Sequence, residues 1–132
     1  MITDKNIIIK DGLTQDDFVK SDIFKDVINY KNHEYTQYYV NPQIIYGKRF
    51  TILLIFNPKG LIEFVKLALL TKNELPDWNN WSESKELERK KLHDEWLKLM
   101  IGIPPYEYNW GYISSNYDPR SGSSMITIRY KY

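Results

Sequence analysis

Three consecutive segments with the periodicity of β-strands are the strongest constraint on how this chain can fold. They cover residues 34–46, 49–56 and 61–70. Gly47 marks the reversal after the first segment, and residues 57–60 read Asn-Pro-Lys-Gly, the preferred chemistry of a type I turn. Reversals this short join antiparallel strands, so the region is predicted to be a three-stranded meander. Pro42 cannot donate a ladder hydrogen bond, which places the first strand at a sheet edge or predicts a bulge there.

The segments at 49–56 and 61–70 are apolar on both of their faces. A sheet that packs helices on one face only should instead alternate, with polar residues on the face turned to water. Two interpretations are open: the sheet curls around its own core, or its second face meets a partner. We favour self-coverage, because monomers rarely expose large apolar surfaces.

Two helical regions flank the meander. A capping-box pattern at residues 14–17 (Thr-x-x-Asp) predicts a helix that extends to Ile28 and can divide at Ser21. A longer helix is predicted over residues 82–101, with either Ser82 or Ser84 as its cap. The predicted apolar stripe of this helix consists of Leu92, Trp96, Leu99 and Met100.

Strands are also predicted near both ends of the chain. Residues 7–9 form a run of three isoleucines, and residues 109–117 and 123–131 flank a proline-containing turn, the pattern of a hairpin. The predicted order is β-α-β-β-β-α-β-β. The sequence therefore predicts a single α+β domain over residues 1–132, with an antiparallel sheet of about five or six strands and two helical segments packed on one face.

Composition argues against several classes of function. The 18 basic and 17 acidic side chains give a net charge of +1, without the broad basic field of most nucleic-acid binders, so no nucleic-acid partner is expected. The absence of cysteine rules out disulfides and zinc–thiolate sites. No apolar run approaches the length of a membrane span, and residues 1–5 do not open a secretory signal. We expect no membrane association and a cytoplasmic location.

No constellation of residues points to catalysis. His33 and His93 are the only histidines and have no ligand spacing, so no metal site is predicted. The chain has no G-x-S-x-G motif, glycine-rich phosphate loop or dinucleotide fingerprint, and no cofactor is expected. Because catalytic groups can converge from distant positions, enzyme activity is unsupported rather than refuted, and no catalytic residue is assigned.

Aromatic residues are the remaining candidates for a binding site. Trp78, the first residue of a Trp-x-x-Trp pair, is either an exposed platform for a sugar, a base or a protein side chain, or a clamp between helix and sheet. Trp110 and Tyr112 share one predicted strand face, which indicates a binding surface, with core packing of Trp110 as the alternative. Tyr117 and Arg120, toward the hairpin tip, complete the candidate set; Arg120 either anchors a partner or is simply solvated.

Three stretches of the chain carry a family resemblance. They are Trp78-x-x-Trp81-Ser82, the segment Glu-Leu-Glu-Arg-Lys-Lys-Leu-His-Asp-Glu-Trp-Leu at 86–97, and Trp110-Gly111-x-Ile113-x-Ser115-x-Tyr117-Asp118. They resemble a group of small uncharacterised α+β proteins from low-GC Gram-positive bacteria, and the resemblance covers most of the chain. In size and character those proteins are similar to immunity proteins encoded beside polymorphic toxins. The resemblance implies a toxin-binding role and assigns no functional residue.

The leading hypothesis from the sequence is a non-enzymatic protein-binding module, immunity-like or homodimeric, that uses an aromatic-rich sheet face. The alternative is a small-ligand or carbohydrate-binding protein, or an enzyme acting on such a ligand. In that case Trp78, Trp110 and Tyr112 are expected to line a cleft.

Overall fold

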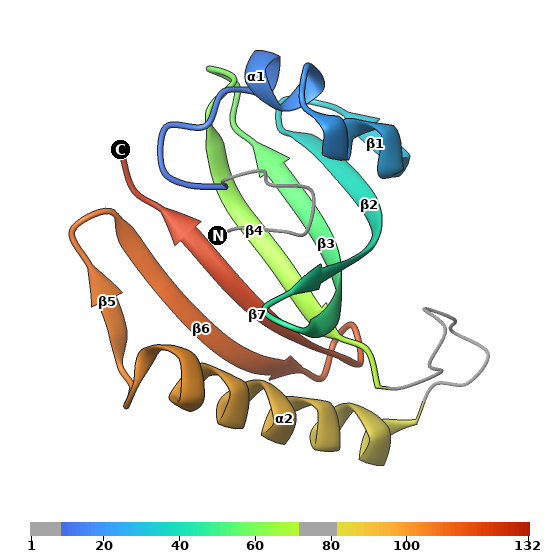
Figure 1. Cartoon of the computed structure of the whole chain (residues 1–132), viewed down its shortest axis with the longest axis vertical. Coiled ribbons are helices and arrows are strands. Elements are labelled where there is room, and N and C mark those ends of the chain that lie inside the picture. The colour runs from blue at the N-terminus through green and yellow to red at the C-terminus, as the bar shows by residue number, and fades with distance from the viewer. Residues whose placement is uncertain (1–8, 72–81) are drawn as a thin grey trace.

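The computed structural model describes residues 9–71 and 82–132, which contain a seven-stranded antiparallel sheet (Figure 1). The strands are β1 (Val27–Asn32), β2 (Thr36–Ile45), β3 (Lys48–Phe56), β4 (Ile62–Leu69), β5 (Tyr106–Tyr108), β6 (Gly111–Asp118) and β7 (Ser123–Tyr130). Their order across the sheet is β1-β2-β3-β4-β7-β6-β5, so the two halves of the chain meet where β4 pairs with β7. The predicted α+β class with an antiparallel sheet is confirmed.

The predicted meander is confirmed as β2, β3 and β4. The Asn57 carbonyl oxygen accepts from the Gly60 amide at 2.9 Å, and the Asn57 side-chain oxygen accepts from the Lys59 amide at 3.0 Å, which closes the β3–β4 turn. At the β2–β3 turn, Tyr46 and Gly47 both have positive φ, 48° and 81°. Two left-handed residues are the geometry of the hairpin turn whose twist matches that of its strands.

Pro42 lies at a bulge, as predicted. The register between β2 and β3 shifts between Val40 and Gln43. β1 pairs with β2 from the β1–β2 turn only as far as Val40. Pro42 has no amide hydrogen, and it lies beyond the part of β2 that pairs with β1, so no ladder donor is needed on the β1 side.

The predicted number of strands, five or six, is wrong because β1 and β5 extend the sheet at its two edges. β1 begins at Val27 and Ile28, which the sequence assigned to the end of the first helix. Pairing with β2 satisfies its backbone and overrides the helix-like spacing of Val27 and Ile28. β5 has three residues, too few to show a period in the sequence.

The predicted order of elements is corrected in the same way. Within the described residues the chain runs through a short helix, a 3-10 turn, four strands, the long helix and three strands. Of the predicted first strand, Ile9 is buried but lies outside any strand, and residues 7–8 lie outside the described residues.

The first helical region forms two pieces, α1 (Gln15–Val19) and a 3-10 helix (Asp22–Asp26). The hydroxyl oxygen of Thr14 caps α1 by accepting from the Asp17 amide at 3.1 Å. The buried ring of Phe18 lies 5.0 Å from that of Tyr38 and 5.7 Å from that of Phe56, measured between centroids. These rings attach α1 to one face of the sheet, over β2 and β3.

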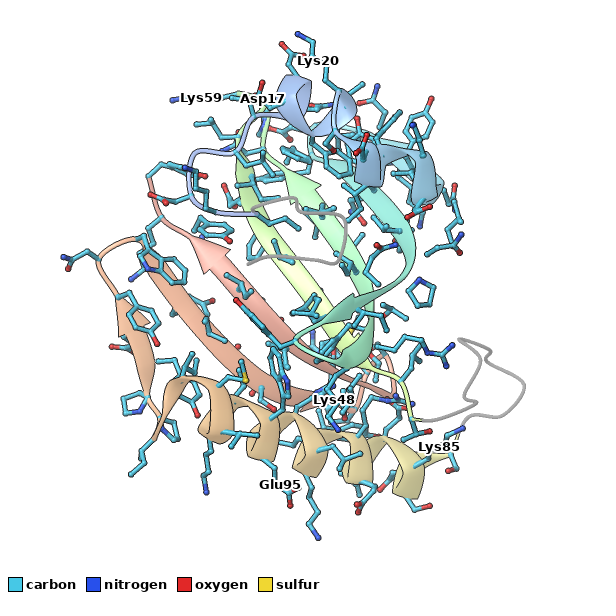
Figure 2. All side chains as sticks on the ribbon, viewed as in Figure 1. Asp17, Lys20, Lys48, Lys59, Lys85 and Glu95 are labelled. Atoms are coloured by element: carbon cyan, nitrogen blue, oxygen red, sulfur yellow. The ribbon has the colours of Figure 1, made fainter. Side chains whose placement is uncertain are left out.

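The long helix is α2 (Glu83–Ile101), and Ser82 caps it by accepting from the Lys85 amide at 3.2 Å. It runs across β4, β7 and β6 at the end of the sheet opposite α1 (Figure 1). The ring of Trp96 lies 4.8 Å from that of Phe50, which shares a sheet face with Tyr38. Both helices therefore pack on the same face, as predicted, and Glu95 projects from the outer side of α2 (Figure 2).

The predicted apolar stripe of α2 is only partly correct. Leu92 and Trp96 are half-buried, but Leu99 is 83% exposed. The residues that α2 buries are Glu86, Arg89, His93 and Leu97. The helix is rotated so that three polar side chains face the sheet.

Gly111 is a glycine with no room for a side chain. It has φ +152°, and a Cβ there would lie 1.8 Å from the main-chain oxygen of Arg129. We predict that Gly111→Ala lowers the free energy of unfolding by about 3 kcal/mol or more, because β6 and β7 must separate. Gly60→Ala is the matched control: φ is +77°, no atom lies within 4 Å, and the expected loss is about 1 kcal/mol. Urea denaturation measures both, and equal losses would contradict this packing.

Candidate functional site

Three polar side chains of α2, which we call the α2 anchor, are buried against the sheet: Glu86, Arg89 and His93. The guanidinium of Arg89 donates to the Leu69 carbonyl oxygen and lies 3.2 Å from the Glu86 carboxylate. That carboxylate accepts from the Ser124 amide at 3.0 Å, and His93 Nε2 accepts from the Leu69 amide at 2.9 Å. Each side chain thus binds the main chain of β4 or β7.

The α2 anchor lies where the ladder between β4 and β7 stops. The last paired residues are Leu67 and Ile126, and continuing this register by two residues would pair Leu69 with Ser124. Leu69 and Ser124 are the residues whose main-chain groups bind the α2 anchor. Because unpaired buried main-chain groups are costly, the helix side chains replace the missing ladder bonds and fix α2 on this face.

His93 is neutral in this environment. Burial, together with the positive charge of Arg89, lowers the pKa of His93 to about 4; Lys90 acts in the same direction and Asp94 opposes it. The unprotonated Nε2 can accept the Leu69 amide, and Nδ1 has no hydrogen-bond partner among the described residues. Protonation would remove this acceptor and place a second cation beside Arg89.

The α2 anchor predicts a specific pH dependence of stability. Unfolded His93 takes up its proton near pH 6.5, whereas the folded protein resists protonation until about pH 4. Stability is therefore lost as the pH falls between these values, by about 3 kcal/mol from this residue. His93→Gln keeps an oxygen acceptor and cannot titrate. Denaturation at pH 7 and at pH 4 gives the loss of unfolding free energy between the two pH values, and this loss should be about 3 kcal/mol smaller in the variant than in the unaltered protein. Parallel profiles for the two proteins would refute the assignment.

The sheet face opposite the helices, which we call the open face, differs from the helix face. On the helix face, alternate residues of β2, β3, β4 and β7 are buried. The open-face apolar and aromatic side chains are only half-buried: Tyr39, Leu53, Ile55, Phe64, Ala68, Tyr112 and Met125. The self-coverage favoured from the sequence is not found among the described residues, since α1 and α2 both pack on the other face.

A row of paired residues crosses the open face from one edge of the sheet to the other. In order it contains Lys31, Gln37, Ile55, Phe64, Arg129, Tyr112 and Glu107. In the neighbouring row, Lys66 lies between Leu53 and Thr127. Basic residues that are far apart in the sequence thus stand among aromatic and aliphatic side chains.

Two of these bases lie over aromatic rings of the same face. The Lys31 ammonium is 5.9 Å from the centre of the Tyr39 ring. The Arg129 guanidinium is 5.3 Å from the centre of the Phe64 ring. Contacts of this kind hold the cations near the sheet surface while leaving them accessible to an anion.

The sequence-predicted site residues do not form one surface. Tyr112 lies on the open face, half-buried and opposite Arg129. Trp110 packs against the core instead: its ring stacks on Tyr108 at 5.0 Å and lies 5.3 Å from that of Tyr130. The expected common face of Trp110 and Tyr112 is not formed, because Trp110 lies in the turn before β6 and does not follow the strand alternation.

The other three candidates lie elsewhere. Tyr117 shares the helix face with Ile113 and stands near the start of α2, where partial burial and then the charges of Glu83 and Glu86 raise its pKa. Arg120 is exposed in the β6–β7 turn. Trp78 lies outside the described residues.

A cleft of about 390 Å³ opens on the helix face between α2, the β2–β3 turn and the segment before α1. Its lining is mainly apolar and includes Tyr46, Trp96, Trp110, Ile113, Ile128 and Tyr130. Burial raises the pKa of Tyr130, so its hydroxyl remains a hydrogen-bond donor at neutral pH. The volume lies within the range of small-molecule sites.

The open-face cations were missed from the sequence because they come from three strands. The register of β1, β4 and β7 is what places Lys31, Lys66 and Arg129 on the same face of the sheet. The available signal was the apolar character of both faces of β3 and β4.

The fold and these surfaces define a single-sheet α+β protein with one covered face and one open face. Comparison of the chain with protein-family models, curated proteins and solved structures finds no match. Within the described part of the chain, no helix is long and apolar enough to span a membrane.

Proposed function

We propose that this protein is a non-enzymatic protein-binding module that docks a partner on the open face of its sheet. The observation that carries the proposal is the apolar centre formed by Leu53, Ile55 and Phe64 on β3 and β4, which neither described helix covers. Central strands that are apolar on both faces are typical of sheets covered on both sides. A docked protein would supply the second layer that the described helices do not provide.

The composition of the open face supports a protein partner. Tyr39, Phe64 and Tyr112 are the residue types enriched in interface cores, and they surround the aliphatic centre. Polar side chains such as Gln37 and Ser114 lie among them and can form specific hydrogen bonds. The immunity-like version of the proposal identifies this partner as a toxin encoded beside the gene for this protein.

A paired set of variants tests the proposal. Leu53→Gln with Ile55→Gln makes the centre of the open face polar, and Leu87→Gln with Leu99→Gln does the same on the exposed side of α2, where those leucines are 43% and 83% exposed. The binding partner for the test is the purified product of a toxin gene found next to the gene for this protein. Titration calorimetry should show about 100-fold weaker binding for the open-face pair, the loss typical of two truncated anchor residues.

The control pair should bind the same product as the unaltered protein does. Equal affinities for both pairs would place the binding site elsewhere. A neighbouring gene product that does not bind at all would contradict the immunity-like version. Thermal unfolding checks that both variants remain folded.

The cleft supports a second candidate function, the binding of a small, mainly apolar ring compound. Its volume of about 390 Å³ and its Trp96, Trp110 and Tyr130 rings are the specific observations that favour it. The lining offers few polar groups, so a sugar would leave its hydroxyls unpaired.

Fluorescence distinguishes this candidate. Nitrobenzene, a non-fluorescent apolar ring compound, should quench the tryptophan emission of the protein in a saturable way, and glucose should not. Trp110→Phe preserves an aromatic wall and should reduce the quenching amplitude. A linear response without saturation, or the same amplitude in the variant, would contradict a site in the cleft.

A further inference from the structure

The charges of the open face point to the chemistry of the partner. Resting on the proposed function, we infer that the open face binds an acidic protein surface, with partner carboxylates on Lys31, Lys66 and Arg129. These bases belong to β1, β4 and β7 and surround the apolar centre at Leu53 and Ile55. Neither an acidic partner nor a role for these cations follows from the spacing of the residues in the chain.

None of Lys31, Lys66 and Arg129 forms an ion pair with another residue of the described ranges. Of the nearby carboxylates, Glu107 is in the edge strand β5 and Asp118 ends β6. Glu63 lies in β4 and accepts from the Tyr35 hydroxyl at 3.3 Å, within electrostatic range of Arg129. Asp118 already accepts the Arg120 amide at 2.9 Å. The three bases are therefore available to partner carboxylates, and Glu63 is the carboxylate of the chain itself that lies near Arg129.

The positions of the cations suit a broad protein surface. Lys31 and Arg129 belong to the same cross-strand row but are four strands apart, about 19 Å at the usual strand spacing. Lys66 lies between them in the adjacent row. Partner carboxylates at comparable spacing could reach all three bases while apolar side chains cover the centre, and such complementarity sets orientation and specificity.

The same geometry disfavours a single-stranded nucleic acid. Base-binding sheets offer free aromatic faces for stacking. On the open face, Lys31 lies over the Tyr39 ring and Arg129 over the Phe64 ring. These rings are therefore engaged by cations of the chain itself, and the aliphatic residues between them provide no partner for a phosphate.

A second copy of the chain is disfavoured by its charge. Two open faces packed against each other would bring Lys31, Lys66 and Arg129 of both copies into one interface. Like charges facing each other in an interface cost several kcal/mol. The homodimeric version of the binding hypothesis therefore does not fit this face.

Charge reversal at the three bases tests the inference. The variant is Lys31→Glu, Lys66→Glu and Arg129→Glu, and the control is Lys20→Glu, Lys48→Glu and Lys59→Glu, which changes the net charge equally away from the open face (Figure 2). The probe is a fluorescent peptide of alternating leucine and glutamate, and its binding is measured by anisotropy at low and physiological salt. We expect binding to weaken at least about tenfold in the variant and to change little in the control.

Further probes separate the alternatives. Oligothymidylate and a leucine–lysine peptide replace the acidic peptide in parallel titrations, and light scattering reports the oligomeric state. No binding of the acidic peptide, or equal loss in the control, would overturn the acidic-partner inference. Tighter binding of oligothymidylate that the open-face charge reversal abolishes would overturn both the inference and the protein-binding proposal. A dimer that the same variant dissociates would identify a second copy as the occupant and overturn the inference alone.

The two proposals can fail separately. Loss of partner binding in the Leu53→Gln and Ile55→Gln protein, without loss in the charge-reversal protein, would retain the open face as the docking surface and reject its acidic partner. Unchanged partner binding in both proteins would reject the docking surface itself.

Discussion

The attachment of α2 to the main chain of β4 and β7 determines which face of the sheet this helix covers. Glu86, Arg89 and His93 bind the groups that Leu69 and Ser124 would otherwise exchange in the ladder. A buried ion pair is seldom a net source of stability, because desolvation offsets its attraction. Here its hydrogen bonds satisfy main-chain groups that have no strand partner. The gain is a fixed position for the helix, and with it a fixed choice of covered face.

The open face is the consequence of that choice. With α1 held by Phe18 and α2 held by its anchor, both helical layers lie on one side of the sheet. The apolar side chains of the opposite side, centred on Leu53 and Ile55, are only half-buried, and neither described helix packs on them. The cations over Tyr39 and Phe64 add charged, water-exposed groups to this surface, while its centre stays apolar. A surface with an apolar centre and charged groups around it is suited to a reversible protein contact.

The turns and the helix cap could be predicted from the sequence because each depends on a few neighbouring residues. The turn at 57–60, an edge position or bulge at Pro42, and a serine cap at Ser82 or Ser84 follow from single residues whose hydrogen-bonding and φ preferences are strong. β1 could not be predicted, because its strand state depends on pairing with β2. The rotation of α2 was equally hidden, since charged helix residues ordinarily face water and the need for Arg89 and His93 inward arises only where β4 and β7 separate.

The candidate site shows the same division. The sequence indicated aromatic residues as binding candidates and strands that are apolar on both faces. Of those candidates, Tyr112 does lie on the open face. It could not place Trp110, whose turn position breaks the strand alternation. It also could not show that Lys31 and Arg129, four strands apart, lie on the same face of the sheet. Those relations are set by register across the sheet, a long-range property that no short window of residues contains.

Methyl NMR of the protein titrated with the acidic peptide tests the central claim most directly. Successive residues of β3 point to opposite faces, so Leu53 and Ile55 serve as reporters and Ile52 and Leu54 as controls on the same strand. The account predicts shifts at Leu53 and Ile55, with Ile52 and Leu54 little changed. Shifts confined to Ile113 and to the other methyls that line the cleft would contradict it and place binding on the helix face.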